Sequence, residues 1–349
     1  MRADLVRSAP PRPELRSTSI CVWRELLTCV VLCGCGFRSN AAPGDSGSGD
    51  PIDAVAEDAP VADDATDTPA ASCWDHWLAH DVFLEPPVEL TQLSSNGQDR
   101  DPWISQDGLE LYFAREPGMQ GMSDVYFATR TSTAQPFANA TEVTNLSSDM
   151  QDSRVSLTED GLTLVMSSNR QGGAQIYLIT RTSRAVGFGP PGQDGLSKVN
   201  GPGNSRDNYD PFLTADGGKL YLAPDPNGNE PQHIWVSSFD RDADEFLPPV
   251  KVPGINAADP GADADPALSL DERVIVFTSD RTGGEGSGDL YYATRAAPTQ
   301  PFSAPASMPN LNLSGGDGDP MLSADGCELY FASTRTGGDY DLYVSRVRR

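Results

Sequence analysis

Lysine is almost absent from this chain, and its scarcity narrows the range of partners. Lys198, Lys219 and Lys251 are the only lysines, and 50 acidic residues against 25 Lys and Arg give a formal net charge of −25. Nucleic-acid phosphates are bound through clustered Lys and Arg, so we exclude a nucleic-acid partner. The acidity suits solubility, cations or a basic partner surface.

Familiar enzyme signatures are also missing. The sequence has no Gly-x-Ser-x-Gly elbow, no His-Glu-x-x-His zinc motif, no P-loop and no dinucleotide-binding fingerprint. These absences favour a protein that is not an enzyme and carries no cofactor, with calcium as an alternative at one cluster described below.

The N-terminal region lacks an apolar run long enough to span a bilayer. The run Leu26–Leu32 follows several arginines and is far shorter than the roughly 18 residues that a spanning helix needs. Its end, Leu32-Cys33-Gly34-Cys35, resembles the bacterial lipobox. The resemblance implies a signal peptide over residues 1–34, lipidation of Cys35 and an outer-membrane location, facing the periplasm or the cell surface. The alternative is cleavage without lipidation.

Residues 35–72 have the composition of a tether. From residue 39 onward they are rich in Ala, Asp, Pro, Gly, Ser and Thr, with no aromatic residue and no Lys or Arg. Such a segment buries too little apolar surface to offset its ordering entropy. We expect a disordered acidic arm that holds a globular head, residues 73–349, away from a membrane to which only the lipid attaches it.

Five copies of one pattern fill residues 83–349. A turn aspartate recurs at intervals of 53 to 56 residues, at Asp107, Asp160, Asp216, Asp271 and Asp325. Each is followed by an apolar triplet such as Leu329-Tyr330-Phe331 and then by a second strand signal such as Asp341-Leu342-Tyr343. A period near 50 residues built only from strands predicts an all-β propeller.

The arrangement of the copies predicts how the ring closes. A further strand is expected from Phe83, Phe137, Phe188, Phe246 and Phe302, and Pro three residues later in four of these copies places it at the blade edge. The chain begins with such an outer strand and ends with an inner triple. We therefore predict five four-stranded antiparallel blades, with the N-terminal strand completing the last blade; six blades would need a repeat before residue 83, where no strand pattern occurs.

Two cysteines remain after the signal region and the lipid site are set aside. Cys73 lies just before the propeller and Cys327 follows the turn of the last copy. In an oxidising compartment such a pair is expected to form a disulfide. This bond would lock the N-terminal segment to the last blade; the alternative is two unrelated thiols.

The most suggestive polar cluster comes from the first strand of each copy. Six residues before each turn aspartate stands an acid or, in the second copy, an arginine: Asp101, Arg154, Asp210, Asp265 and Asp319. Inner strands line a propeller axis, so these side chains are expected to converge at one mouth of the channel. They could bind a cation such as calcium, or a basic partner. The alternative is repeated turn and blade-to-blade hydrogen bonding.

Two other motifs carry weaker metal signals. The loop Asp225–Glu230 has oxygen ligands at alternate positions, but a turn explains it better. His76 and His80 are spaced as on one helical face, without a third ligand. The neighbouring tryptophans favour a packing role for this segment.

The repeat resembles the TolB-type propeller repeat of bacterial periplasmic proteins. The last two copies carry it best, through Asp265-Pro266, Gly283-Gly284 and Asp289-Leu290-Tyr291 and through Asp319-Pro320, Asp325-Gly326 and Asp341-Leu342-Tyr343. The resemblance covers residues 83–349 and implies a monomeric propeller that binds an envelope protein. We therefore expect a non-catalytic protein-binding or scaffolding module. The alternative is a propeller that binds or cleaves glycans, since some five-bladed propellers are glycosidases, which use two carboxylates.

Overall fold

A computed structural model describes residues 72–117, 122–201, 207–225, 231–256, 261–308 and 310–348. The predicted signal peptide, Cys35 and nearly all of the predicted tether lie outside these residues, as does most of the loop Asp225–Glu230. Within the described ranges, none of the helices has the length and apolar character needed to cross a membrane.

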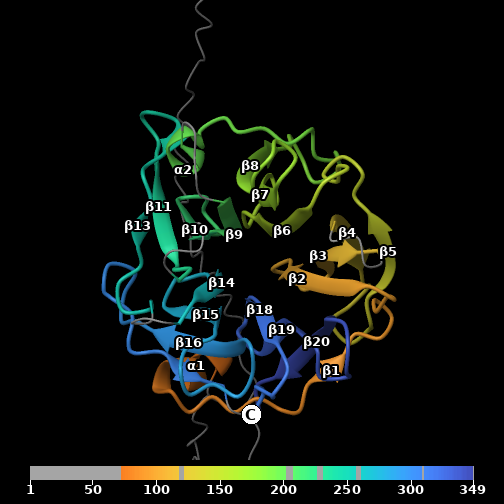
Figure 1. The fold of residues 1–349 in the computed structure, drawn as a ribbon, viewed down its shortest axis with the longest axis vertical. Coiled ribbons are helices and arrows are strands. Elements are labelled where there is room, and N and C mark those ends of the chain that lie inside the picture. Colours follow the sequence, from red (N-terminus) through yellow and green to blue (C-terminus); the bar gives the residue numbers. More distant parts are fainter. Residues whose placement is uncertain are drawn as a thin grey trace, which may run out of the picture. The chain divides into compact units, whose positions relative to one another are not determined.

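The described strands form five antiparallel sheets, which are the blades of a propeller (Figure 1). The innermost strands contact one another in a closed cycle around the axis. They are β2 (Gln98–Ile104), β6 (Asp152–Leu157), β9 (Asp207–Leu213), β14 (Asp263–Leu268) and β18 (Asp317–Leu322). The predicted fold class and blade number are confirmed.

The second strand of each blade carries the apolar triplet, whose three residues are buried on both faces of the sheet. Leu329, Tyr330 and Phe331 are at most 1% exposed, for example. The second strands are β3 (Glu110–Glu116), β7 (Thr163–Ser168), β10 (Lys219–Asp225), β15 (Val274–Ser279) and β19 (Glu328–Ser333). The third strands are β4 (Asp124–Thr129), β8 (Gln175–Thr180), β11 (Trp235–Asp240), β16 (Asp289–Thr294) and β20 (Asp341–Arg346).

The outer strands are shorter and less regular than expected. They are β1 (Val88–Glu89), β5 (Ala138–Glu142), the pair β12 (Glu245–Phe246) and β13 (Val250–Lys251) on β11, and β17 (Ala306–Ser307). Four of the predicted starting phenylalanines are buried anchors next to these strands, but Phe83 is 51% exposed and precedes β1 by several residues.

The second blade corrects the prediction of four strands in every blade. Its sheet contains only β6, β7 and β8, and the segment after Phe188 contributes a single bridge between Leu178 and Gly192. Pro190 and Pro191 lack the N–H groups that a ladder needs, which explains why no regular strand forms there.

The ring closes as predicted. Strand β1 pairs antiparallel with β20, with Val88 opposite Val344 and Glu89 opposite Tyr343. The first strand of the propeller thus completes the last blade, and β20 has no unpaired outer edge at these positions.

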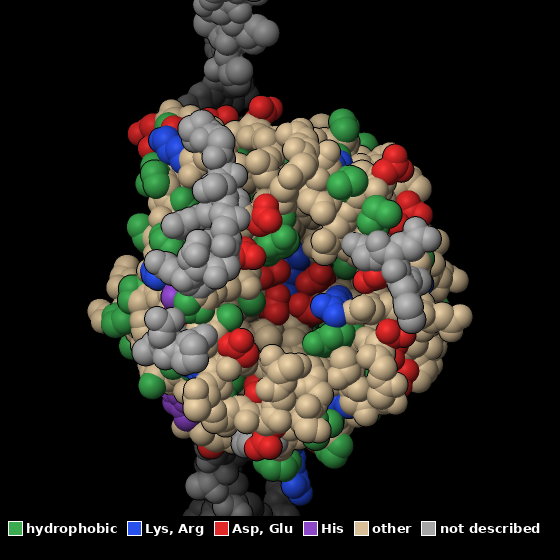
Figure 2. All heavy atoms as spheres, in the orientation of Figure 1, with side chains coloured by type: hydrophobic (Ala, Val, Ile, Leu, Met, Phe, Trp, Pro, Cys, Tyr) green, Lys and Arg blue, Asp and Glu red, His purple; other side chains and the backbone are tan. Residues whose placement is uncertain are grey.

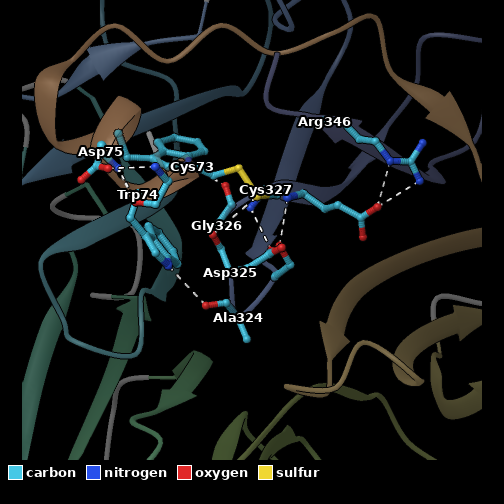
Figure 3. The surroundings of a disulfide bond; sticks show 12 residues. Cys73, Trp74, Asp75, Ala324, Asp325, Gly326, Cys327 and Arg346 are labelled. Carbon is cyan, nitrogen blue, oxygen red and sulfur yellow. Dashed lines mark hydrogen bonds and ion pairs between the residues drawn. A yellow bond between two sulfur atoms is a disulfide. The ribbon is translucent and has the colours of Figure 1, made fainter. Parts of the chain in front are cut away.

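A short helix, α1 (Cys73–Ala79), fastens the N-terminal segment to the last two blades (Figure 3). Cys73 and Cys327 form a disulfide with Cα atoms 5.1 Å apart. The Trp77 indole donates to the Gly326 carbonyl at 2.8 Å, and the Trp74 indole donates to the Ala324 carbonyl at 3.3 Å. Trp77 is fully buried, so this segment packs against the propeller.

The two histidines of α1 are not positioned as a metal pair. His76 Nδ1 lies 3.0 Å from the Asp81 carboxylate, whereas His80 is the C-cap and its Nε2 lies 2.8 Å from the Thr294 hydroxyl of the fourth blade. The His80 contact lets α1 bridge the seam between the fourth and fifth blades.

Candidate functional site: an acid ring with a central arginine

The five residues predicted to converge do so around the propeller axis. The space-filling view shows acidic side chains beside basic side chains in a central hollow (Figure 2). Arg154 Nη1 lies 3.6 Å from Asp101, 3.8 Å from Asp265 and 3.7 Å from Asp319, measured to carboxylate oxygens. Carboxylate oxygens of Asp101, Asp210 and Asp265 lie within 4.8 Å of one another. We call these five residues the acid ring.

Each ring residue stands at an irregularity in its innermost strand. The five φ angles are positive, between 44° and 56°, and the strand register shifts beside each of them. A bulge bends the strand and redirects a side chain. Strand alternation alone therefore does not determine the direction of these side chains. We interpret the bulges as the feature that directs all five side chains toward the axis.

The sequence contained a signal for these bulges. All four ring aspartates are followed by proline, as in Asp101-Pro102 and Asp319-Pro320. Proline has no N–H for the ladder and is placed at edges or bulges of sheets. Aspartate tolerates the left-handed region better than most residues, whereas Arg154 does not share that advantage.

The ring is partly buried, and Asp210 and Asp265 are more exposed than its other three members. Asp101, Asp319 and Arg154 are 9%, 8% and 5% exposed, respectively. Burial raises the pKa of Asp101, and burial together with neighbouring carboxylates raises the pKa values of Asp210 and Asp319 well above the ordinary range. Arg154 opposes all three shifts. Burial and like charge therefore favour the protonated forms of these three carboxyl groups relative to an exposed aspartate.

Arg154 supplies the positive charge of the ring. Burial works against its charge, but Asp265, Asp101 and Asp319 outweigh burial and raise the pKa of the guanidinium. Its Nη2 donates to the Pro266 carbonyl at 3.2 Å. Its Nη1 is buried and has no hydrogen-bond partner, since the surrounding carboxylate oxygens lie beyond hydrogen-bond distance.

A cavity of about 400 Å³ stands over the ring. Its wall is rich in amide, hydroxyl and phenol groups, from Gln98, Gln151, Gln232, Ser123, Ser153 and Tyr209. The Arg100 guanidinium also lines it and lies 3.8 Å from the centre of the Tyr340 ring. At the other end of the axis, buried apolar residues from all five innermost strands meet: Trp103, Leu157, Phe212, Leu268 and Met321.

A second set of acids, which recurs in four of the five copies, has a structural role. Asp99, Asp152, Asp263 and Asp317 stand two residues before four of the ring positions and are at most 1% exposed. Each pairs with an arginine of the same blade; Arg115 Nε to Asp99 is 2.7 Å and Arg335 Nη2 to Asp317 is 2.6 Å. Their backbone contacts, such as Ser95 N–H to Asp99, tie the entering loop to the blade.

Two polar seams between blades were not anticipated from the sequence. Between the third and fourth blades, Glu272 accepts from Arg295 at 2.9 Å, Lys219 at 2.6 Å and Tyr221 at 3.2 Å. Between the first and fifth blades, Glu328 accepts from Tyr330 at 2.6 Å and faces Arg130 at 3.6 Å. These residues come from adjacent blades, so only the closed ring brings them together.

Comparisons with known proteins identify the fold and no family. No protein-family model matches the chain, and no curated protein matches it. Among solved structures, a thermostable family-43 glycoside hydrolase is similar over 75% of this chain and 92% of its own, with 14% identity and a TM-score of 0.53. The RS223 β-xylosidase is similar over 75% and 95%, with 16% identity and a TM-score of 0.51.

A putative TolB from Agrobacterium tumefaciens is also similar, over 71% of this chain and 76% of its own, with 18% identity and a TM-score of 0.45. The two likenesses with TM-scores above 0.5 show a shared fold, at identities too low to show more. The function must be argued from the site.

Proposed function

We propose that this propeller is a glycan-active protein that takes a sugar unit into the cavity over the acid ring. The observation that carries the proposal is the mixture of hydrogen-bond donors and acceptors that lines the cavity. The four ring aspartates offer carboxylate oxygens, and the Arg100 guanidinium and three glutamine amides offer N–H groups. A sugar presents hydroxyl groups that both accept and donate, so it complements both.

The cavity wall supports the same ligand class. A site of about 400 Å³ is within the size range of small-molecule sites. Its amide and hydroxyl groups can fix the orientation of a polyol through hydrogen bonds. The two neighbours with TM-scores above 0.5 are a glycoside hydrolase and a β-xylosidase, which supports a glycan as the ligand class.

The ring also has the groups that glycoside hydrolysis requires. A carboxyl group that keeps its proton near neutral pH can act as a general acid, and a nearby ionised carboxylate can act as a base or nucleophile. Asp210 and Asp319 have the raised pKa values for the first role. These features favour the glycan alternative over the protein-binding module expected first from the sequence, and they bring enzymatic activity into consideration.

The test is a glycan array followed by turnover assays on every sugar that binds. In the variant Asp210→Asn/Asp319→Asn, we expect affinity to fall about 10- to 100-fold, since each of the two hydrogen bonds that are lost contributes about 0.5–1.5 kcal/mol. Turnover should fall further because the proton donor is lost. Asp271→Asn, at a turn at the far end of the fourth blade, is the control and should bind normally. Absence of saturable binding to any glycan would refute the proposal.

We also propose that the chain is exported and anchored by a lipid on Cys35. The Leu32-Cys33-Gly34-Cys35 sequence supports this, together with the acidic segment that follows. In a bacterial host fed a fatty-acid probe, Cys35→Ala should abolish both labelling and membrane association. Cys33→Ala, two residues away, should retain both. Unchanged labelling of Cys35→Ala would place the lipid on another residue, and absence of label from the wild-type chain would leave only cleavage without lipidation.

A further inference from the structure

The second blade leaves part of its outer edge open. Its outermost strand is β8 (Figure 1). The Leu178 N–H donates outward to the Gly192 carbonyl, whereas the Arg181 N–H donates inward to the second strand. Because neighbouring residues of a strand alternate in this respect, the N–H and C=O groups of Thr180 point outward. Thr180 is exposed, and these two groups have no hydrogen-bond partner among the described residues.

The other four blades cover the equivalent position. In each of them the outer segment bonds to the residue that corresponds to Thr180. These contacts join Ala138 to Thr129, Leu247 to Ser238, Ser303 to Thr294 and Glu85 to Arg346. In the second blade Gly189 has the place of Ser303, but Pro190 and Pro191 follow it and restrict the backbone of this segment. A strand edge left open in this way can pair with another chain.

A groove of about 930 Å³ lies beside the open edge, which is within the size range of ligand sites. The second blade contributes Leu178 and Thr180 to its lining, and the third blade contributes Phe239 and Phe246. Leu178 and Phe239 are half-buried. The groove therefore combines unpaired backbone groups with apolar surface that a side chain can cover.

The lining of the groove is strongly acidic. Its charged members are five exposed acids and one arginine: Glu159, Asp160, Asp194, Asp216, Asp244 and Arg241. The acidic segment 39–72 of this chain has no Lys or Arg, and a second copy of the chain has a net charge of −25. Both would be repelled, so the charges favour a basic segment of another protein.

We propose that this groove binds an extended basic peptide segment of another protein, which pairs with Thr180 in the place of the missing outer strand. The peptide backbone donates to the Thr180 carbonyl and accepts from the Thr180 N–H. Alternate apolar side chains contact Leu178 and Phe239, and Lys or Arg side chains face the acids. No acid-ring residue lines the groove, so the inference is independent of the glycan function.

Calorimetry with short capped peptides tests the inference. One peptide alternates valine with lysine, and its control alternates valine with glutamate. We expect saturable binding of the lysine peptide and affinity lower by about 10-fold or more for the glutamate peptide, whose carboxylates face the acids of the groove.

Variants of the protein test the role of the acids. Asp194→Asn/Asp244→Asn should weaken binding of the lysine peptide about 3- to 10-fold and reduce its dependence on salt. Asp244 has a φ of 53°, which asparagine also tolerates. The control Asp149→Asn/Asp339→Asn removes the same charge from exposed loops outside the groove and should bind the peptide normally.

Hydrogen exchange locates the contact. The Thr180 amide should exchange more slowly when the lysine peptide is bound, whereas the Leu178 amide, which is already bonded to Gly192, should change little. Binding without slower exchange at Thr180, equal binding of the two peptides, or no saturable binding would each overturn the inference. Dimerisation of the free protein that slows exchange at Thr180 would assign the groove to a second copy and also overturn it. None of these results alters the test of the glycan function.

Discussion

Replacement of Cys73 and Cys327 by serine is expected to reduce the free energy of unfolding by up to roughly 5 kcal/mol. The disulfide joins residues 254 positions apart, and in the chain-entropy model so long a loop restricts the unfolded chain by about that amount. Chemical denaturation of the exported protein, with and without reductant, measures the change. Wild type under reducing conditions should match the double serine variant.

A second comparison shows whether the bond acts on the unfolded chain or on the folded contacts. The indoles of Trp74 and Trp77 donate to carbonyls of the last blade without involving the sulfur atoms, so we expect these bonds to persist after reduction. The reduced protein should therefore keep Trp77 buried and give the native fluorescence spectrum in the absence of denaturant. Identical denaturation midpoints for oxidised and reduced protein would contradict the proposed stabilisation.

Arg154→Met is expected to be the most damaging single substitution in the acid ring. It removes the only cation that faces Asp101, Asp265 and Asp319 at ion-pair distance among the described residues. Loss of one partner from a buried ion-pair group costs about 3–5 kcal/mol, because the remaining charges stay uncompensated. Thermal and denaturant unfolding at neutral pH measure the loss.

The loss of folding stability in Arg154→Met should increase with pH. Arg154 opposes the raised pKa values of Asp101, Asp210 and Asp319, so its removal should raise them further. A carboxyl group with a raised pKa in the folded state favours folding at low pH and loses that contribution as pH rises from its unfolded pKa, about 4, through its folded pKa. The stability difference between wild type and Arg154→Met should therefore be small near pH 4 and grow toward pH 8.

Arg184→Met provides the matched control in the same blade. Its side chain is 42% exposed and lies 4.0 Å from Asp107, and exposed pairs contribute about 0–1 kcal/mol. If Arg154→Met reduced the free energy of unfolding no more than Arg184→Met does, or by an amount independent of pH, Arg154 would not stabilise the ring.

The repeat made the architecture predictable from the sequence. The turn aspartates and apolar triplets mark the same three strands in every blade, because each blade packs against its two neighbours in the same way. The placement of β1 beside β20 was predictable because the repeats begin with an outer strand and end with a blade that lacks one. The pairing of Cys73 with Cys327 was predictable because the other cysteines lie in the predicted signal region and lipid site. The second blade departs from this pattern because Pro190 and Pro191 interrupt its outer strand, a local effect that the average repeat conceals.

The acid ring was predictable in its members but not in its geometry. The repeat identified Asp101, Arg154, Asp210, Asp265 and Asp319 as equivalent positions, whereas strand alternation does not reveal a bulge. The depth of the ring and the central place of Arg154 depend on five strands meeting at once. The seams around Glu272 and Glu328 also join residues of neighbouring blades, so no single repeat contains their pattern.

The disulfide also determines how the propeller transmits mechanical force. Cys73 precedes β1 in the chain, and its partner Cys327 lies next to β19 in the middle of the last blade. Tension on the residues before Cys73 therefore passes through the sulfur–sulfur bond into a central strand that is paired on both sides. The two-residue strand β1, which a pull would otherwise peel from β20, is outside this load path and stays unstressed.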